Sequence, residues 1–264
     1  MTMLDHSFDD GEAYERFMGC WSRAVAKPFL CWLAAPPRSA WLDVGCGTGA
    51  FTRAVLDHAG ACCVAAVDPS AAQVAFARRQ ILDEQARFEV ADAQALPFAA
   101  GCFDVVGSAL VLNFVADRGA ALGEMKRVAR PGALIAAYVW DFDAELSPSG
   151  PLRAAMRRIG ATVPPMPGGS DSTTAALTGL FLSAGLEDVS CRQIEVAATF
   201  RDFPEYWQAQ TPSYSPMTKV IDDLAPWRRT ALVQAVQAML PTAKDGTIQY
   251  AARANTVKGR VPAR

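Results

Sequence analysis

The chain has 264 residues and about half of them are hydrophobic, which is enough to bury the core of one large domain or two small ones without disulfides or metals. Lysine and arginine number 25 against 27 aspartates and glutamates, so the chain lacks the basic excess typical of proteins that grip nucleic acid. The N-terminal stretch is acidic, and no apolar run approaches the roughly 18 residues that span a bilayer. We therefore expect a cytoplasmic protein with neither a membrane nor a nucleic acid as partner.

Cysteine and histidine offer little to a metal centre. There are seven cysteines and only two histidines, and no two cysteines have the CxxC spacing of zinc sites. An odd cysteine count also argues against a disulfide framework. We expect buried, reduced thiols and no bound metal.

Strands and helices are expected to alternate along the first half of the chain. A helical pattern over residues 14–34 comes first, and Pro28 is expected to interrupt it. The strands that follow are predicted at residues 40–45, 62–67, 87–91, 103–110 and 133–140, with helices after residue 50 and at 71–84 and 117–129. This alternation predicts a parallel, doubly wound α/β sheet whose strands end at one common edge, where such sheets bind ligands.

Beyond residue 140 the pattern changes. Residues 141–172 are rich in proline, glycine and serine, which predicts a loop around one short helix near 152–159. The remaining predicted elements are a helix at 173–184, a strand at 189–200, an aromatic-rich helical segment at 203–240 and a last strand at 247–257. We expect a helical cap over residues 1–39 and one domain over 40–264, in which residues 141–172 and 203–240 are lids over the substrate.

A glycine-rich turn follows the first predicted strand, with the sequence Asp43-Val-Gly45-Cys46-Gly47-Thr-Gly49. Alternating glycines let the backbone turn tightly and approach a ligand without interference from Cβ atoms. The N-terminus of the next helix offers free N–H groups and partial positive charge to a phosphate or a carboxylate. The turn therefore predicts a binding site for an anionic or nucleoside-containing ligand.

Acidic residues stand at the ends of the next two strands. Asp68 is placed to accept hydrogen bonds from two ribose hydroxyls, a geometry that NAD and S-adenosylmethionine sites share. Asp92 is placed to accept from the exocyclic amine of adenine. Each of these acids alone fits a helix cap or a loop equally well. Asp43, Asp68 and Asp92 together, at three strand ends beside a glycine turn, favour a nucleoside cofactor.

These segments resemble the motifs of class I methyltransferases. Residues 41–49 (WLDVGCGTG) resemble motif I, residues 67–70 (VDPS) resemble motif II, and residues 91–98 (ADAQALPF) resemble the adenine-binding segment. Together with residues 103–106 and 127–132, they are similar to the methyltransferase domain of the ubiquinone- and menaquinone-biosynthesis type (methyltransferase type 11). The resemblance covers residues 40–140 and is specific for the cofactor, not for the substrate. It implies a Rossmann-like sheet of seven strands in the order 3-2-1-4-5-7-6, with strand 7 antiparallel.

The resemblance also implies where S-adenosylmethionine binds. The residues that it assigns to the methionine part and the ribose are Asp43, Gly45, Cys46, Gly47, Asp68, Pro69 and Ser70. Those that it assigns to adenine and to the sulfonium region are Asp92, Ala93, Leu110 and Val111.

The N-terminal segment, which also resembles a segment of some family members, adds Tyr14 and Arg23 as candidates for the methionine carboxylate. A surface amphipathic helix is the alternative interpretation of that segment.

The expected reaction is displacement of the methyl group from the sulfonium by a small-molecule acceptor, leaving S-adenosylhomocysteine. Alignment of the acceptor opposite the S–CH3 bond supplies most of such catalysis, and a general base is optional. No catalytic dyad is evident, so no catalytic residue is assigned. Asn113 orients the substrate or is a plain loop residue, and Tyr206 or Tyr214 would act as a base only with a depressed pKa. The aromatic residues of 203–240 indicate either an apolar acceptor or a lid core.

Two other functions are compatible with the pattern. One is a module that binds S-adenosylmethionine without turnover. The other is an NAD-binding oxidoreductase, which the GxGxG form of the turn and the Asp92 segment disfavour. A protein acceptor stays open, and the sequence determines neither the acceptor atom nor the oligomeric state.

Overall fold

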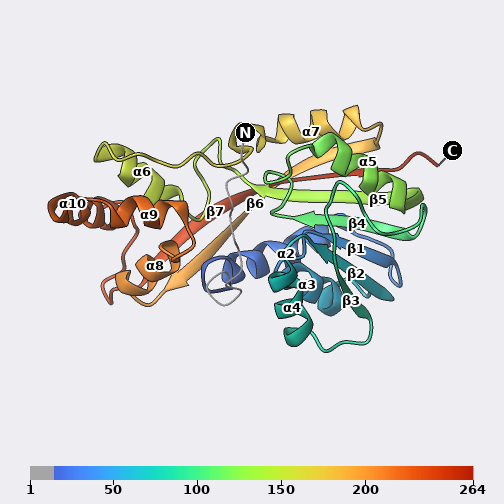
Figure 1. Cartoon of the computed structure of the whole chain (residues 1–264), viewed down its shortest axis with the longest axis horizontal. Coiled ribbons are helices and arrows are strands. Elements are labelled where there is room, and N and C mark those ends of the chain that lie inside the picture. Colours follow the sequence, from blue (N-terminus) through green and yellow to red (C-terminus); the bar gives the residue numbers. More distant parts are fainter. Residues whose placement is uncertain (1–14, 264) are drawn as a thin grey trace.

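The computed structural model describes residues 15–263, apart from the side chain of Arg16, and its centre is a seven-stranded sheet (Figure 1). The strands are β1 (Ala40–Val44), β2 (Cys63–Asp68), β3 (Ala86–Val90), β4 (Phe103–Ala109), β5 (Ala129–Trp140), β6 (Glu187–Phe200) and β7 (Ile248–Arg260). Their order is β3-β2-β1-β4-β5-β7-β6, and β7 is antiparallel to both of its neighbours. The predicted Rossmann-like α/β fold, its strand order and its antiparallel strand 7 are confirmed.

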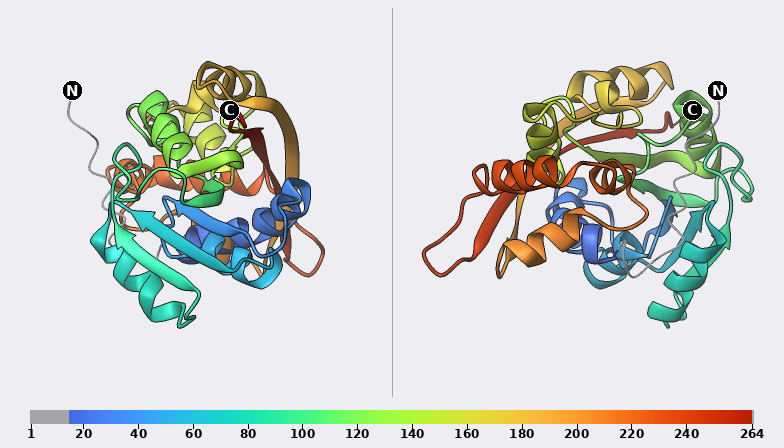
Figure 2. Two further views of the ribbon diagram at one scale, coloured as in Figure 1. Left: turned by 90° about the vertical axis from the view of Figure 1, so that its right-hand side faces the viewer. Right: turned by 60° about the vertical axis from the view of Figure 1, so that its left-hand side comes forward.

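Helices cover both faces of this sheet (Figures 1 and 2). They are η1 (Glu15–Gly19), α2 (Cys20–Leu33), α3 (Ala50–His58), α4 (Ala71–Gln80), α5 (Arg118–Val128), α6 (Gly150–Arg158), η2 (Gly169–Asp171), α7 (Thr174–Ser183), α8 (Phe203–Gln210), α9 (Pro216–Asp222) and α10 (Pro226–Gln237). None of the helices within residues 15–263 is both long and apolar enough to cross a bilayer.

The core is divided by β5, whose successive side chains point to opposite faces of the sheet. Leu134, Tyr138 and Trp140 pack into the cluster that contains α2 and α3. Ile135 and Val139 pack into the cluster that contains α5 and α7. The continuous apolar run in the sequence is thus a strand buried on both faces, as expected for the middle of a doubly wound sheet.

The expectation that Pro28 interrupts the first helix is wrong. Helix α2 runs through Pro28 from Cys20 to Leu33. The ring lies on the exposed side of the helix, while Trp21, Val25 and Phe29 are fully buried on the other side. Burial of these large apolar side chains outweighs the single backbone hydrogen bond that proline removes.

The aromatic-rich segment 203–240 forms three short helices, α8, α9 and α10, between β6 and β7. They lie at the far end of the long strands β6 and β7, away from β1, β2 and β3 (Figure 1). Turns at residues 211–215 and 223–225 divide what the sequence suggested as one helical stretch. The division of the chain into a cap over 1–39 and lids over 141–172 and 203–240 stays a prediction.

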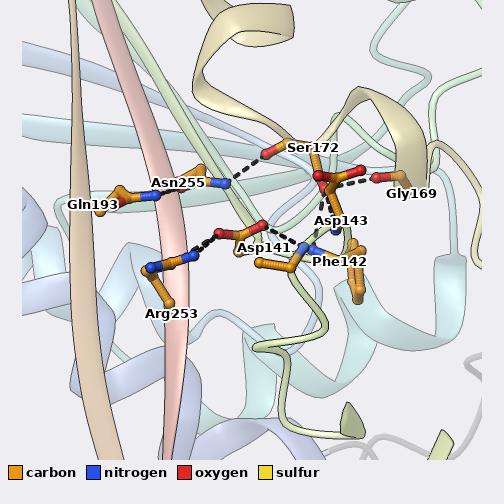
Figure 3. A network of polar contacts seen from close by, with 9 residues as sticks. Asp141, Phe142, Asp143, Gly169, Ser172, Gln193, Arg253 and Asn255 are labelled. Atoms are coloured by element: carbon orange, nitrogen blue, oxygen red, sulfur yellow. Dashed lines mark hydrogen bonds and ion pairs between the residues drawn. The ribbon is translucent and has the colours of Figure 1, made fainter. Parts of the chain in front are cut away.

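A polar network fastens the segment 141–172 to β7 (Figure 3). The buried Asp141 accepts hydrogen bonds from Nε of Arg253 at 2.8 Å and from its Nη2 at 2.7 Å. Oγ of Ser172 accepts from the backbone N–H groups of Phe142 and Asp143 at 3.1 and 3.3 Å. The side chain of Asn255 donates to the carbonyl of Ser172 at 2.8 Å. Both ends of the segment are therefore held on the sheet.

We predict that Arg253→Ala lowers the free energy of unfolding by about 3 kcal/mol, because it leaves the buried Asp141 carboxylate without its charged partner. Chemical denaturation measures this change. The matched control is Arg201→Ala, since Arg201 forms an ion pair with Glu205 but its side chain is 83% exposed. The control variant should unfold almost like the wild type. Equal effects of the two substitutions would contradict the role given to the Asp141–Arg253 pair.

Candidate functional site

The glycine-rich turn after β1 is held against the end of β2. The backbone N–H groups of Gly45 and Cys46 both donate to the carbonyl of Val67, at 2.8 and 2.9 Å. Gly45 has a φ of +81°, and a Cβ atom added there would lie 2.4 Å from a methyl carbon of Val111. Only glycine fits this position without displacing the loop that follows β4.

Asp68, at the end of β2, joins the glycine turn to the start of α4. Its Oδ2 accepts from the backbone N–H of Gly47 and its Oδ1 from that of Ser70, both at 2.9 Å. Burial raises the pKa of Asp68, and the hydrogen bonds from Ser70 and Gly47 oppose this shift. Each carboxylate oxygen has two lone pairs, so each retains one for a further donor. The carboxylate is therefore fixed in position and able to accept a pair of hydroxyl groups.

Asp43, in β1 beneath the turn, is almost fully buried. Its Oδ2 accepts from the hydroxyl of Thr52 in α3 at 2.6 Å, while its Oδ1 has no hydrogen-bond partner within the described structure. Burial, together with the nearby charge of Asp68, raises the pKa of Asp43 to about 7, although the Thr52 hydroxyl lowers it. A buried, unpartnered carboxylate oxygen is costly, and a cationic or hydrogen-donating ligand at this site would remove that cost.

A cavity of about 200 Å³ opens at the carboxyl ends of β1, β2, β4 and β5. The predicted site residues on its wall are Gly45, Gly47, Asp68, Pro69, Leu110 and Val111. The other lining residues are Phe17, Met18, Gln73, Asn113, Phe114, Trp140, Phe142, Pro148, Ser149 and Met166. Most of these additional side chains are apolar, so the cavity has a polar edge at the glycine turn and Asp68 and an apolar remainder.

The segment 141–172 supplies part of this apolar wall. Gly168 packs so closely on the backbone of Asn113 that an added Cβ atom would lie 2.7 Å from the Asn113 carbonyl oxygen. The Asn113 amide group also donates to the carbonyl of Pro167, at 3.4 Å. These contacts position Met166 at the cavity. Asn113 is 5% exposed and lines the cavity, and whether it orients a substrate or is a plain loop residue stays a prediction.

The aromatic side chains of 203–240 play a different part. None of residues 203–240 lines this cavity, and a lid role for the segment stays a prediction. Tyr206 is buried in the core cluster, while Trp227 is 72% exposed. Burial raises the pKa of Tyr206, which makes it a poor base.

Three predicted residues flank the cavity without lining it. The backbone N–H of Cys46 is bonded to Val67, and its thiol is buried. The hydroxyl of Ser70 caps α4 by accepting from the N–H of Gln73. Asp43 lies beneath the turn. These three residues support the residues that line the cavity and do not face the cavity themselves.

The predicted adenine-binding pair lies on a more open surface. The side chain of Asp92 is exposed and accepts from the backbone and side-chain nitrogens of Gln94, at 2.8 and 3.1 Å. Ala93 is buried against the core. The structure therefore places these residues beyond the cavity wall, at the end of β3.

Arg23 does not reach the cavity. Its side chain is 58% exposed and forms an ion pair with Glu15. The other oxygen of Glu15 accepts from the hydroxyl of Thr48 in the glycine turn at 3.1 Å, so η1 and α2 are tied to the turn through Glu15. Tyr14, the second candidate for the methionine carboxylate, lies outside the described residues.

The expectation of buried thiols is wrong for most of the cysteines. Cys46 is buried, but Cys20, Cys31, Cys62 and Cys63 are exposed, because they lie at element ends and on the outer side of α2. None of the seven cysteines forms a disulfide bond. Within residues 15–263, no group of three or more His, Cys, Asp and Glu side chains is arranged to hold a metal ion.

Sequence reasoning missed several residues that shape the site. Thr52 lies three positions after Gly49, in the first turn of α3 and on the buried side of that helix. A polar side chain at that position is a signal that could have identified it as a partner of Asp43. Trp140, Phe142 and Met166 carry no such signal, because their places on the wall depend on how the segment 141–172 folds back.

We predict that Gly45→Ala destabilises the fold more than Gly101→Ala does. Both glycines have positive φ values, of +81° and +69°, but an added Cβ atom meets nothing within 4 Å at Gly101. The control substitution should cost about 1 kcal/mol for the left-handed backbone alone. Gly45→Ala should cost more, since Val111 must also move. Chemical denaturation measures both, and equal losses would show that the approach of Val111 is not tight.

Asp43 should make stability depend on pH. Its raised pKa means that the folded chain favours the neutral carboxyl. The contribution of Asp43 to the free energy of unfolding is therefore full below the ordinary pKa of about 4 and is lost as pH rises through about 7. Relative to Asp43→Asn, the wild type should lose stability on the order of 4 kcal/mol over this window. Urea unfolding at a series of pH values measures it. Asp68 titrates in both proteins, so parallel pH profiles would rule out a buried, proton-binding Asp43.

Comparison with known proteins assigns the central part of the chain. Residues 42–137 match the model of the family described as "Methyltransferase domain". The malonyl-[acyl-carrier protein] O-methyltransferase of Pectobacterium atrosepticum is 35% identical over 131 residues, which are 47% of this chain and 50% of that protein. The ubiquinone/menaquinone biosynthesis C-methyltransferase of Hahella chejuensis is 39% identical over 98 residues, which are 34% of this chain and 39% of that protein.

Solved structures show the same fold over more of the chain. A putative methyltransferase from an antibiotic biosynthesis pathway of Anabaena variabilis superposes with a TM-score of 0.62, covering 89% of this chain and 98% of that one at 16% identity. The sequence matches span half or less of the curated relatives' own lengths. Within these bounds, residues 42–137 are a class I S-adenosylmethionine-dependent methyltransferase domain of the ubiquinone- and menaquinone-biosynthesis type.

Proposed function

We propose that the protein transfers the methyl group of S-adenosylmethionine to a small-molecule acceptor. The observation that carries this proposal is the Asp68 carboxylate, fixed by Gly47 and Ser70 and left with one free lone pair on each oxygen. A ribose presents two adjacent hydroxyl groups, which match this pair of acceptors. The apolar cavity begins beside the same carboxylate.

The residues around Asp68 suit the rest of the cofactor. The glycine turn leaves its backbone open to a ligand at Gly45 and Gly47, both of which have positive φ values. The orphaned Oδ1 of Asp43 is a ready acceptor for the ammonium group of the methionine part, directly or through one water. Asp92 and the buried Ala93 stand at the end of β3, where the adenine of the same ligand would lie.

The cofactor's sulfonium supplies a reactive methyl group, and the protein's task is to align an acceptor and keep water away. The wall formed by Val111, Phe142 and Met166 is suited to both tasks because it is apolar. The named relatives are a malonyl-[acyl-carrier protein] O-methyltransferase and a ubiquinone/menaquinone biosynthesis C-methyltransferase, so the acceptor chemistry differs among proteins with a similar domain. A small apolar acceptor is the class that the cavity of this chain favours.

The proposal is tested by calorimetric titration of the wild type with S-adenosylmethionine and, separately, with NAD. We expect micromolar binding of S-adenosylmethionine alone. Asp68→Ala should weaken it at least tenfold, because charge-assisted hydrogen bonds to the ribose are lost. The matched control is Asp57→Ala, which removes an exposed carboxylate on α3 and should leave the affinity unchanged.

Binding of NAD in place of S-adenosylmethionine, or of neither, would overturn the proposal. Tight cofactor binding without methyl transfer to any member of a broad panel of small acceptors would favour a module that binds without turnover. The cytoplasmic location and the lack of a nucleic-acid partner stay predictions from composition and charge.

A further inference from the structure

A second cavity, of about 150 Å³, adjoins the one described above. Phe142 and Met166 line both cavities, so these two side chains form the partition between them. The character of the second cavity is different, because its lining includes Arg153, Arg157 and Glu145. The second cavity, which has two arginines and one glutamate on its wall, thus adjoins the mainly apolar first cavity.

Arg153 is the unusual member of this chamber. Arg157 forms an ion pair with Glu145. Arg153 has no carboxylate within ion-pairing distance among residues 15–263, and its one side-chain polar contact there is from Nη1 to the sulfur of Met217 at 4.0 Å. Burial lowers the pKa of Arg153, and the neighbouring Arg157 lowers it further, although Glu145 opposes both. Its guanidinium nevertheless stays charged at neutral pH, so it is a partly desolvated cation, and the nearby Glu145 carboxylate is ion-paired with Arg157 and not with Arg153.

The start of α6 adds to the positive character. The helix begins at Gly150, on the wall of the second cavity, and no side chain caps its N-terminus. The N–H of Gly150 donates to the Ser147 carbonyl at 2.9 Å and Pro151 has no N–H, so the helix start contributes the partial positive charge of its dipole and not a set of free N–H groups. The same short loop lines both chambers, since Pro148 and Ser149 belong to the first and Ser147 to the second.

We propose that the second cavity is an oxyanion subsite for the acceptor, with Arg153 as its main ligand. The acceptor is then an apolar molecule that carries a carboxylate or a phosphate at some distance from the atom that receives the methyl group. This inference rests on the proposed function, because it takes the first cavity as the place of methyl transfer. An extended acceptor would pass between Phe142 and Met166, and the unbranched side chain of Met166 adapts easily to such an occupant.

The alternative is that Arg153 is structural, with its stem packed near Met217 and its head in solvent. The two interpretations differ in a measurable way. A structural arginine contributes to folding but not to discrimination between an anion and a neutral molecule of the same length.

The test compares octanoate, octyl phosphate and octanol as probes, each titrated into the full-length protein and followed by calorimetry and by the fluorescence of the tryptophans, which include Trp140 on the wall. The variants are Arg153→Met, which keeps an unbranched apolar stem, and Arg153→Lys. The control is Arg158→Ala, an exposed arginine on the same helix that lines neither cavity.

We expect the wild type to bind the anionic probes at least tenfold more tightly than octanol. Arg153→Met should abolish this preference without changing octanol binding, Arg153→Lys should restore part of it, and Arg158→Ala should keep it whole. The preferred anion, carboxylate or phosphate, identifies the acid group. The proposal is overturned if the wild type does not prefer anions or if Arg153→Met keeps the preference.

Failure of this inference is distinguishable from failure of the proposed function. The probes require neither S-adenosylmethionine nor turnover, whereas the proposed function is tested by cofactor binding. Loss of the anion preference in Arg153→Met should leave the affinity for S-adenosylmethionine unchanged, since Arg153 lies outside the cavity that contains the glycine turn.

Discussion

The cofactor site depends on one constraint, the fastening of the glycine turn to the end of β2. The Val67 carbonyl holds Gly45 and Cys46, and the Asp68 carboxylate holds Gly47 and the start of α4. All of these bonds are donated by backbone N–H groups, so they do not depend on the side chains of the turn itself. The turn still requires glycine at positions 45, 47 and 49, where φ is positive. Because parallel strands end at one edge, the same arrangement also brings the loop after β4 against the turn, with Val111 packed where a Cβ atom of Gly45 would be.

Asp43, which lies beneath this turn, is buried without all of its hydrogen bonds, and this burial lowers the stability of the fold. The carboxyl is buried under the turn with one oxygen bonded to Thr52 and the other without a partner. In the free chain the neutral form is favoured up to a pH of about 7. A cationic ligand above the turn would favour the charged form instead, so ligand binding and proton release are coupled at this residue. A ligand that supplies a positive charge or a hydrogen-bond donor to Asp43 would therefore remove part of the cost of burying this carboxyl.

Much of the central sheet was predictable because local signals agree there. Residues 40–140 alternate apolar runs with capped helices, and each strand boundary falls within a few residues of the predicted position. The prediction for Pro28 was wrong because it considered only the backbone N–H that proline lacks. Burial of Trp21 and Phe29 against the core stabilises the helix across this position. The site residues also divide into those that local sequence signals identify and those that only tertiary contacts place. Asp68 and the glycines were predictable from spacing, whereas Phe142 and Met166 reach the cavity through tertiary contacts such as Asn113–Pro167 that no local pattern encodes.

On the proposed function, cofactor recognition and acceptor recognition lie in different parts of the chain. The family match ends at residue 137. The residues that we propose form the acceptor side, Trp140, Phe142, Arg153 and Met166, all follow it. This side is held by contacts with β7, through Asp141–Arg253 and Ser172–Asn255, and not by the glycine turn. Relatives that share residues 42–137 are for this reason informative about the methyl donor and uninformative about the acceptor. If the second cavity binds the acceptor as we propose, the charge on Arg153 is the feature of this chain that most narrows the acceptor's chemistry.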